Sequence, residues 1–200
     1  VRERCGPGGV LIPLDAGSLE AAIDAIEAAG VEAVAVALLF AFRFPDHERM
    51  IAARLRQRLP HVHVSRSSDV VPEIREYERF STTCVDAHLS PVVGRYLAGL
   101  GARCRRAGLP EPTIMQSSGG TIDLAAAAAH GAFTVLSGPA GGVIGAADAA
   151  RTAGYHDVLA FDMGGTSCDV ALIQGDPART AATVINGHPV HLPMLDIHTV

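Results

Sequence analysis

The sequence predicts an α/β fold, on three observations. Near the N-terminal end, stretches with apolar residues at helical spacing alternate with continuous apolar runs, which is typical of a parallel sheet covered by helices. Towards the C-terminal end, two short apolar runs enclose adjacent glycines, which indicates a β-hairpin. Apolar side chains make up 48% of the 200 residues, which is enough to bury a real core.

The first part of the chain is expected to hold two helix–strand units. Ser18 can cap a helix that ends at Gly30, and the continuous apolar run over 31–39 predicts a strand buried on both faces. Asp46 can cap a second helix, and the strand that follows is expected over 62–65. Two such units in succession predict parallel strands.

Longer helices are expected in the middle of the chain. The pattern predicts helices over 73–87 and 91–107, separated near Pro91 because proline lacks the helical N–H donor. The first of them carries a run of Glu and Arg, Arg79 included, which is typical of a solvated face. A short strand over 113–116 then leads into Ser-Ser-Gly-Gly-Thr, which could line a cleft or be only a turn.

The most informative stretch is the tip of the predicted hairpin. Gly164 and Gly165 are expected to supply the positive φ angles of the turn, and without a Cβ their N–H groups can approach a phosphate closely. Thr166 and Ser167 add hydroxyl donors. Asp162, at the end of the first strand, can hold a hard cation directly or through water. We therefore predict a cradle for phosphate and Mg²⁺, against the plainer alternative of a hairpin turn without function.

Two better-known phosphate loops do not fit this stretch. A Walker loop needs a lysine at the start of a helix, whereas all 16 basic side chains of this chain are arginines and a strand follows the glycines. A Rossmann fingerprint also needs a helix after its glycines.

A helix rich in small residues is expected just before the hairpin. Ser137 can cap this helix and Gly154 can end it. Its glycines, among them Gly141, Gly142 and Gly145, recur at spacings of three and four and leave one nearly bare face. Because glycine costs about 1 kcal/mol relative to alanine inside a helix, we expect another backbone to cross this face closely, either for function or for packing alone.

The last part of the chain is expected to continue the sheet. The Asn186-Gly187 pair predicts a turn between antiparallel strands over 181–185 and 190–194. Four residues here invite a metal interpretation, but residues three apart on a strand point to opposite faces, so ordinary loop histidines are favoured. These four residues are His188, His191, Asp196 and His198.

The composition argues against several classes of partner. The formal charge of -5 and the lack of basic runs give no footprint for nucleic acid or for an anionic membrane. The longest apolar run, over 33–42, is far too short to span a bilayer, and no signal peptide is recognised. Four cysteines without C-x-x-C spacing are interpreted as free thiols, which favours a cytoplasmic location.

Five motifs together resemble one protein family. A small-residue helix followed by strand-Asp-x-Gly-Gly-Thr-strand is similar to the second phosphate loop of the actin-like ATPases. Within that superfamily, nearly the whole chain resembles the hydantoinase A/5-oxoprolinase family, which includes subunits of the acetone carboxylase type. The motifs are Glu76–Thr83, Met115–Thr121, Ser137–Ala146, Phe161–Ser167 and Pro193–Thr199.

This resemblance implies an actin-like, ribonuclease H-like α/β fold. The chain is then expected to be an internal fragment that spans the end of one lobe and the start of the next. Residues 1–136 would be the remainder of the first lobe, with the family's N-terminal region ending near residue 66. Residues 137–200 would be the connecting helix and the start of the second, phosphate-binding lobe.

The resemblance also implies a function. The complete enzyme would use ATP and Mg²⁺ to activate the oxygen of a cyclic amide or a ketone by phosphorylation, for hydrolysis or carboxylation, together with a hydantoinase B-type subunit. The fragment alone would be inactive. Two alternatives stay open: a small-molecule kinase of the same fold, and a non-catalytic scaffold switched by ATP.

Residue roles follow from the same resemblance. Asp162 would be the catalytic residue and the metal ligand, while the glycines and hydroxyls of the hairpin tip would hold the phosphates of ATP together with Gly141 and Gly142. Asp169 is expected to make a structural bond to the turn, and no chemistry is assigned to Cys168, where the family usually has threonine.

Overall fold

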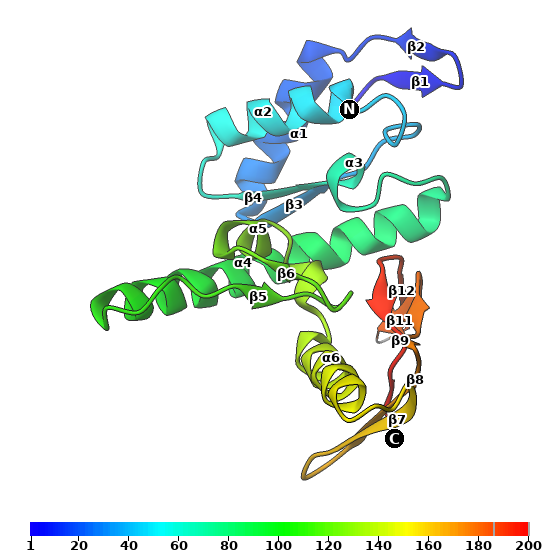
Figure 1. Cartoon of the computed structure of the whole chain (residues 1–200). Helices are drawn as coiled ribbons and strands as arrows, with labels where there is room; N and C mark the ends of the chain where they lie inside the picture. Colours follow the sequence, from blue (N-terminus) through cyan, green and yellow to red (C-terminus); the bar gives the residue numbers. More distant parts are fainter. Residues whose placement is uncertain (186, 200) are drawn as a thin grey trace. The chain divides into compact units, whose positions relative to one another are not determined.

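The computed structural model describes residues 1–185 and 187–199, which form two compact units. The units are described separately below, with the elements of each shown in Figure 1. The first unit comprises Val1–Arg95, Ala128–Ala132 and Val184–His191, and the second comprises Tyr96–Ala127, Phe133–Thr183 and Leu192–Val200.

The first unit contains the two predicted helix–strand pairs, preceded by a small hairpin. Strands β3 and β4 pair in parallel, with Val34 opposite Val64, which confirms the predicted parallel arrangement. The N-terminal strands β1 and β2 pair antiparallel. The elements are β1 (Arg4–Gly6), β2 (Gly9–Ile12), α1 (Ala16–Ala29), β3 (Ala33–Val36), α2 (Asp46–Arg58), β4 (His63–Arg66) and α3 (Ser67–Val70).

The core of the first unit lies between α1, α2 and the parallel strands. Ile23 of α1 and Leu55 of α2 are almost fully buried and pack with Val36 and Val64 of the strands. Burial of a Leu or Ile side chain stabilises a fold by about 1.5–3 kcal/mol. The amphipathic spacing that predicted the helices therefore also supplies the packing that holds them.

Both predicted caps of these helices are wrong by a few residues. Helix α1 begins after Asp15, whose carboxylate accepts the N–H of Ser18 at 2.8 Å, so Ser18 is capped rather than capping. Helix α2 has Pro45 as its N-cap residue without a side-chain bond, and Asp46 lies in the first turn, where it pairs with Arg49. The predicted end of α1 at Gly30 is confirmed, since Gly30 adopts the left-handed conformation with φ 61°.

The first strand is shorter than predicted. It covers only Ala33–Val36, because the chain turns soon afterwards. Most of its side chains are half-buried, whereas burial on both faces was predicted. Phe40 adopts a φ of 58°, and the N–H groups of Arg43 and Phe44 both donate to its carbonyl. An apolar run by itself cannot show where such a turn interrupts a strand.

The predicted break at Pro91 is also wrong, because α4 runs without interruption over Glu76–Arg106. Around the proline, side-chain and loop hydrogen bonds stabilise the helix. The hydroxyl of Ser90 donates to the carbonyl of Asp86 at 2.7 Å and accepts the N–H of Gly131 at 2.9 Å. These contacts hold the turn in which Pro91 removes a backbone donor.

Gly131 occupies the tightest backbone crossing in this part of the first unit. A Cβ on Gly131 would lie 2.9 Å from the Ser90 nitrogen and 3.0 Å from the Leu89 carbonyl carbon, distances that side chains do not tolerate. Gly131 begins the 3₁₀ helix η1 (Gly131–Thr134), which follows α5 (Leu124–Ala129). A glycine is therefore needed at this position for the loop to approach α4.

Arg79, predicted on a solvated face of α4, is instead fully buried. Its Nη1 donates to the Ser67 hydroxyl at 2.9 Å, and that hydroxyl donates to Glu48 Oε1 at 2.6 Å. The guanidinium also lies over the rings of Phe42 and Phe80, with centroids at 5.7 and 5.2 Å. Burial lowers the pKa of Arg79, while the negative charge of Glu48 acts in the opposite direction.

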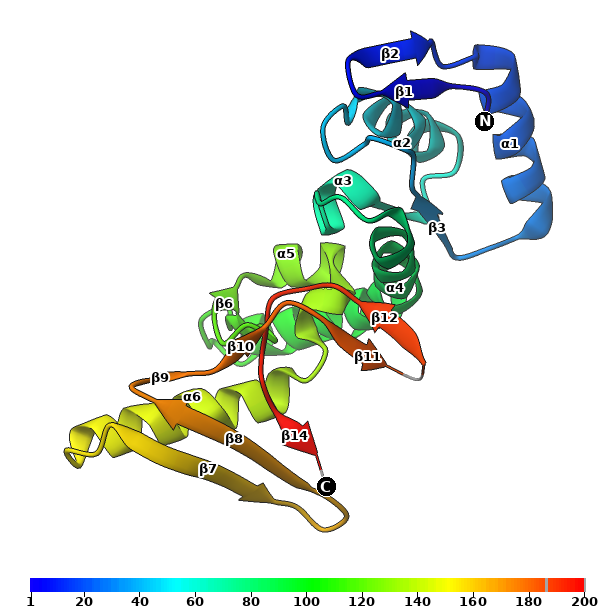
Figure 2. The same cartoon turned by 90° about the vertical axis from the view of Figure 1, so that its right-hand side faces the viewer.

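In the second unit, helix α6 packs along an antiparallel sheet, as Figure 2 shows. Strands β7 and β8 form the predicted hairpin, β14 pairs with the other side of β8, and β9 pairs with the end of β8. The elements are β5 (Ile114–Met115), β6 (Thr121–Ile122), α6 (Ser137–Thr152), β7 (Asp157–Met163), β8 (Cys168–Gln174), β9 (Asp176–Pro177), β10 (Arg179–Thr180), β13 (Met194–Leu195) and β14 (His198–Thr199).

The two faces of the hairpin differ. Ala160, Ala171 and Ile173 are buried against Ala140, Val143 and Ala147 of α6. The opposite face is apolar but open, and its side chains are 50–70% exposed. These exposed residues are Leu159, Phe161, Met163 and Leu172.

The C-terminal strands do not extend the central sheet as predicted. Strands β11 (Thr183–Ile185) and β12 (His188–Val190) form a separate two-stranded sheet, and β10 pairs with β13 in another. Of the described strands from β10 onwards, β14 is the one that pairs with the hairpin. Of the predicted Asn186-Gly187 turn, Asn186 lies outside the described residues, and Gly187 has a φ of 82°.

Among the helices of the part of the chain that the structure describes, none combines the length and apolarity needed to cross a membrane.

Candidate functional site

The predicted phosphate cradle is a regular antiparallel hairpin with two aspartates near its tip. In the register of β7 and β8, Asp162 lies directly opposite Asp169. Because side chains alternate along a strand, both aspartates lie on the side of Ala160 and Ala171, which faces α6. Two carboxylates therefore share one face of the hairpin just beyond its apolar core.

The tip of the hairpin is exposed and closed by one backbone bond. The N–H of Gly164 donates to the carbonyl of Ser167 at 2.9 Å. The predicted positive φ angles are wrong, since neither Gly164 nor Gly165 adopts one. Thr166 and Ser167 are exposed, as are both glycines. The turn thus presents hydroxyls and backbone to solvent without requiring the left-handed conformation.

Asp162 lies against the glycine helix. A Cβ built on Gly142 would be 3.5 Å from Oδ2 of Asp162, which is ordinary van der Waals contact. One residue earlier, Gly141 faces the side chain of Met115 in β5, at 3.8 Å. The structure therefore brings Gly142 and Asp162 together, while Gly141 faces a different neighbour.

The predicted close backbone crossing over the glycine helix is wrong. A Cβ added to Gly138 or Gly145 would have no heavy atom of another described residue within 4 Å, and one added to Gly141 or Gly142 would meet side chains only. Small residues here leave space around the helix instead of admitting another backbone. The space on the side of Gly142 is occupied by the carboxylate of Asp162.

The start of α6 also differs from the prediction. Ser137 is the first helical residue, and the N-cap residue is Leu136, in a left-handed conformation with φ 59° and without a side-chain cap bond. No capping side chain therefore accepts the first N–H groups of α6. Such a helix start favours negatively charged groups.

Asp169 does not bond to the turn as predicted. Its Oδ1 accepts a hydrogen bond from the hydroxyl of Thr199 at 2.6 Å. The two residues are also register partners in β8 and β14, so this bond links the two strands. Among the described residues, no hydrogen bond or ion pair involves the Asp162 side chain, and its Oδ2 lies 3.5 Å from the position that a Cβ on Gly142 would take. Asp169 is thus held in place, and Asp162 is the carboxylate left for a ligand.

The second Gly-Gly-Thr motif forms a turn between β5 and β6. The N–H of Gln116 donates to the Gly120 carbonyl at 2.8 Å, and Gly119 has a φ of 83°. The residues before it also line a cavity of about 180 Å³. The lining residues are Gln116, Ser117, Ser118, Phe133, Leu192 and Pro193, none of which belongs to the predicted phosphate cradle.

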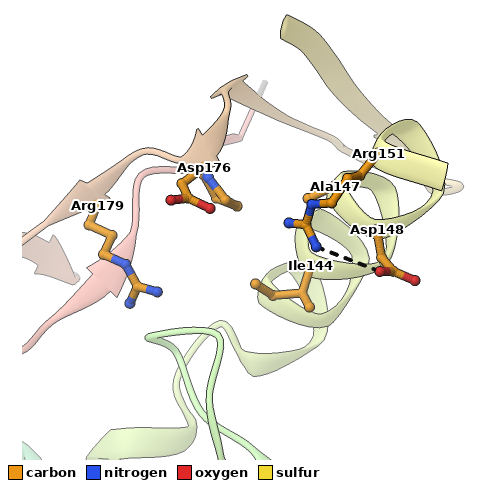
Figure 3. Close-up of a pocket in the computed structure, with 8 residues that line it drawn as sticks. Ile144, Ala147, Asp148, Arg151, Asp176 and Arg179 are labelled. Atoms are coloured by element: carbon orange, nitrogen blue, oxygen red, sulfur yellow. Dashed lines mark ion pairs between the residues drawn. The ribbon is translucent and has the colours of Figure 1, made fainter. Parts of the chain in front are cut away.

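A larger cavity, of about 490 Å³, adjoins α6 (Figure 3). Asp148 and Arg151 on the helix line one side of it, and Asp176 and Arg179 line the other. Arg179 is anchored by donating to the Ser118 carbonyl at 2.7 Å. Gly145 lines this cavity, whereas Asp162 and the hairpin tip do not, so the cavity is separate from the predicted site.

In the part of the chain that the structure describes, the C-terminal histidines and Asp196 are not brought together as a group of potential metal ligands. His191 pairs with Glu73 at 2.8 Å and His198 pairs with Asp196 at 3.7 Å. Sequence reasoning missed a different group, Glu3, Cys5 and His47, whose potential ligand atoms converge. No local motif could have revealed this group, because the histidine lies more than 40 residues from the other two.

Comparison with known proteins places the chain in a family. The model of the hydantoinase/oxoprolinase family matches residues 79–200, and the model of the hydantoinase/oxoprolinase N-terminal region matches residues 1–59. The chain is 35% identical to the caprolactamase subunit alpha of Pseudomonas jessenii, over 96% of this chain and 28% of that protein. It is 36% identical to the 5-oxoprolinase of Saccharomyces cerevisiae, over 93% of this chain and 14% of that protein.

Solved structures agree with these matches. The nucleotide-free structure of acetone carboxylase, from a study of ATP-dependent acetone carboxylation, matches with a TM-score of 0.86 and 29% identity over 99% of this chain and 29% of that chain. The ATP-dependent caprolactamase of Pseudomonas jessenii matches with a TM-score of 0.80 and 33% identity over 98% and 29%. This chain thus spans less than a third of these relatives. It has the α/β fold of the matching part of those enzymes, consistent with an actin-like ATPase fold, and it belongs to the hydantoinase/oxoprolinase family.

Proposed function

We propose that this chain provides part of the ATP site of an enzyme that activates the oxygen of a cyclic amide or a ketone by phosphorylation. Asp162 is the residue on which this proposal rests. It is the carboxylate at the end of β7 that faces α6 beside Gly142 and lies directly opposite Asp169. The names of the relatives, ATP-dependent caprolactamase and acetone carboxylase among them, support this class of chemistry.

The donor set near Asp162 fits a hard cation such as Mg²⁺. Two like charges directly opposite each other on neighbouring strands destabilise a hairpin, so a cation between or beside them would be favourable. The groups at hand are carboxylate and hydroxyl oxygens, which are the ligands Mg²⁺ takes, and the chain contains no lysine to replace the cation. When bound, Mg²⁺ would neutralise charge on the transferring phosphate.

The neighbouring residues would hold the phosphates of ATP. The exposed backbone of Gly164 and Gly165 and the hydroxyls of Thr166 and Ser167 can donate hydrogen bonds to phosphate oxygens. Gly142 would contribute by leaving the surface of α6 bare near the carboxylate, since a larger side chain there would meet Asp162. Gly141 faces Met115 and would contribute only as the adjacent small residue of α6. Positioning and charge neutralisation of this kind provide most of the catalysis in phosphoryl transfer.

The reaction that fits these groups begins with attack of the substrate oxygen on the γ-phosphorus of ATP. ADP leaves with the displaced electron pair. An amide phosphorylated on its oxygen has a carbonyl carbon that water attacks more readily, which opens the ring. A ketone that loses an α-proton to a base and is phosphorylated on its enol oxygen has a nucleophilic α-carbon that can attack CO2 formed from bicarbonate, with phosphate as the leaving group. Asp162 would hold the cation and align the attacking oxygen. Which of hydrolysis and carboxylation follows depends on parts of the enzyme beyond these residues.

The same proposal covers the organisation of the whole protein. Residues 1–136 would belong to one lobe of an actin-like ATPase, with residues 137–200 as the connecting helix and the start of the second lobe. A hydantoinase B-type subunit would be the partner, since the relatives include a caprolactamase subunit alpha and the acetophenone carboxylase gamma subunit of Aromatoleum aromaticum. A cytoplasmic location would suit the free thiols.

Substrate-dependent release of ADP tests this function. The whole protein, with its partner subunit, is incubated with Mg-ATP and a panel of lactams, hydantoins and 5-oxoproline, and of ketones with bicarbonate. We expect ADP release to rise at least tenfold with one class and to match product formed. A stable phosphorylated product would support a kinase instead, and ATP use that no substrate changes would support a scaffold switched by ATP.

A further inference from the structure

Three potential metal ligands from two elements meet in the first unit. Glu3 directly precedes β1, Cys5 lies within β1, and His47 lies in the first turn of α2, and Figure 2 shows β1 close to α2. Cys5 Sγ is 3.7 Å from His47 Nδ1, and Glu3 Oε2 is 2.7 Å from the same nitrogen. All three ligand atoms lie within 4.8 Å of one another, the only such group found among residues 1–185 and 187–199.

The group is buried and negatively charged. Cys5 is 2% exposed, and the side chains of His47 and Glu3 are 8% and 7% exposed. A buried carboxylate is costly unless a positive charge or several hydrogen bonds compensate it. The Glu3 carboxylate contacts His47 Nδ1 at 2.7 Å, and Asp46 adds a second negative charge near Cys5. The surroundings therefore favour a cation.

A role for Cys5 as a catalytic nucleophile does not fit this geometry. In a Cys–His–acid triad the thiol and the acid bind opposite nitrogens of the imidazole. Here both approach Nδ1 of His47. Burial, and next the charge of Glu3, raise the pKa of the Cys5 thiol, so the thiol remains protonated rather than reactive when no cation is present.

The distances suit a tetrahedral ion after a small adjustment. Zinc lies about 2.3 Å from sulfur and about 2.0–2.2 Å from nitrogen or oxygen, so its ligand atoms are about 3.3–3.7 Å apart. The distance between Cys5 and His47 already has this value. The hydrogen-bonded contact between His47 and Glu3, at 2.7 Å, would open by roughly 0.6 Å once the proton between them is replaced by a metal.

We propose that Glu3, Cys5 and His47 form a binding site for a borderline-soft divalent cation, zinc above all, which fixes the β1–β2 hairpin to α2. Three protein ligands leave a fourth position for water. Thiolate and imidazole together prefer zinc to the hard cation Mg²⁺, so this site is distinct in kind from the one proposed at Asp162.

The charge balance of binding is favourable. On binding, the thiol of Cys5 gives up its proton, and the imidazole of His47 would ligate through Nδ1 as the tautomer that carries its ring proton on Nε2. One proton is released for each ion bound. With Glu3 ionised, the net charge of the three side chains and the ion then changes from -1 to zero, which removes an uncompensated charge from a buried position.

Zinc and cobalt binding to the whole protein test the proposal. After treatment with a chelator, calorimetry with zinc should show one site that Mg²⁺ does not fill, and zinc should raise the melting temperature. Cobalt should produce a thiolate charge-transfer absorption. In Cys5→Ser the absorption should vanish and zinc should bind at least tenfold more weakly, whereas Cys104→Ser should match the wild type.

A second variant keeps the result interpretable if Cys5→Ser unfolds. His47→Gln should weaken zinc binding to a similar degree, with His61→Gln, an exposed histidine of the same unit, as its control. In the wild type, zinc should also protect Cys5 from a thiol-specific alkylating reagent, as mapped by mass spectrometry. The proposal is overturned if the wild type binds no zinc, or if the cobalt spectrum persists in Cys5→Ser.

Discussion

Asp162 is the residue on which the proposed function depends most. Asn keeps the shape of the side chain and removes its charge, so Asp162→Asn should lower turnover of the whole enzyme by roughly a hundredfold, the scale of losing one preorganised electrostatic contact. Stability without nucleotide should stay equal or rise slightly, because the repulsion from Asp169 across the hairpin is relieved. Turnover and the melting temperature, each with and without Mg-ATP, check both parts.

Asp157→Asn is the matched control for this prediction. Asp157 lies at the exposed far end of the same strand, so its variant should retain wild-type turnover. An Asp162→Asn protein that melts earlier but turns over normally would show that Asp162 only supports the turn, and the metal-binding role would have to be abandoned.

Glu48 and Arg79 form the second case at the scale of residues. The carboxylate of Glu48 accepts bonds from the N–H groups of Leu38 and Ser68 and from the Ser67 hydroxyl, all at 2.6–2.9 Å. In Glu48→Gln, the side-chain NH2 group replaces one carboxylate oxygen and points at an N–H or O–H group that needs an acceptor. The buried positive charge of Arg79 also loses the negative charge that compensates it. We expect a loss of about 3 kcal/mol in the free energy of unfolding, measured with urea.

A double-mutant cycle separates the two causes of this loss. If the charge of Arg79 matters, Glu48→Gln should cost clearly less in an Arg79→Met background than alone. Equal costs in both backgrounds would leave only the lost hydrogen bonds as the cause. Asp46→Asn, on the surface of the same helix, should change stability by no more than about 0.5 kcal/mol.

At the scale of elements, two glycines of similar appearance in the sequence have opposite roles. Gly131→Ala should destabilise the fold by about 1–3 kcal/mol, because the added Cβ meets the backbone of α4 at 2.9–3.0 Å. Gly145→Ala should be neutral or stabilise by up to about 1 kcal/mol, because its Cβ meets open space inside a helix. Urea unfolding of both variants decides; equal effects would contradict the described packing around Gly131.

The sequence was sufficient for the main elements because their signals are local. Apolar periodicity located α1 and α2, and Gly30 marked the end of α1. The hairpin of β7 and β8 followed from two apolar runs around a short polar turn. The resemblance of five motifs to one family led to the α/β fold that the solved relatives confirm.

The failures share a physical cause, which is that distant neighbours override local preference. Helix α4 passes Pro91 because Ser90 and Gly131 support that turn, and Gly131 lies 41 residues after Ser90 in the sequence. Arg79 is buried because Ser67, Glu48 and two phenyl rings surround it. The group of Glu3, Cys5 and His47 likewise exists only once β1 meets α2.

At the scale of the whole molecule, the open face of the hairpin has a consequence for handling the chain by itself. In the described part of the chain, strand β7 lies at the edge of its sheet. It carries the exposed apolar side chains of Leu159, Phe161 and Met163. A free strand edge next to an apolar surface is a template for pairing with another copy.

The 200-residue chain should therefore self-associate as its concentration rises, as sedimentation velocity can measure. Phe161→Lys should suppress this association without unfolding the hairpin, whereas Val184→Lys, at an exposed valine of β11, should not. A chain that stays monomeric at high concentration would mean that the edge of β7 is better protected than its exposure indicates.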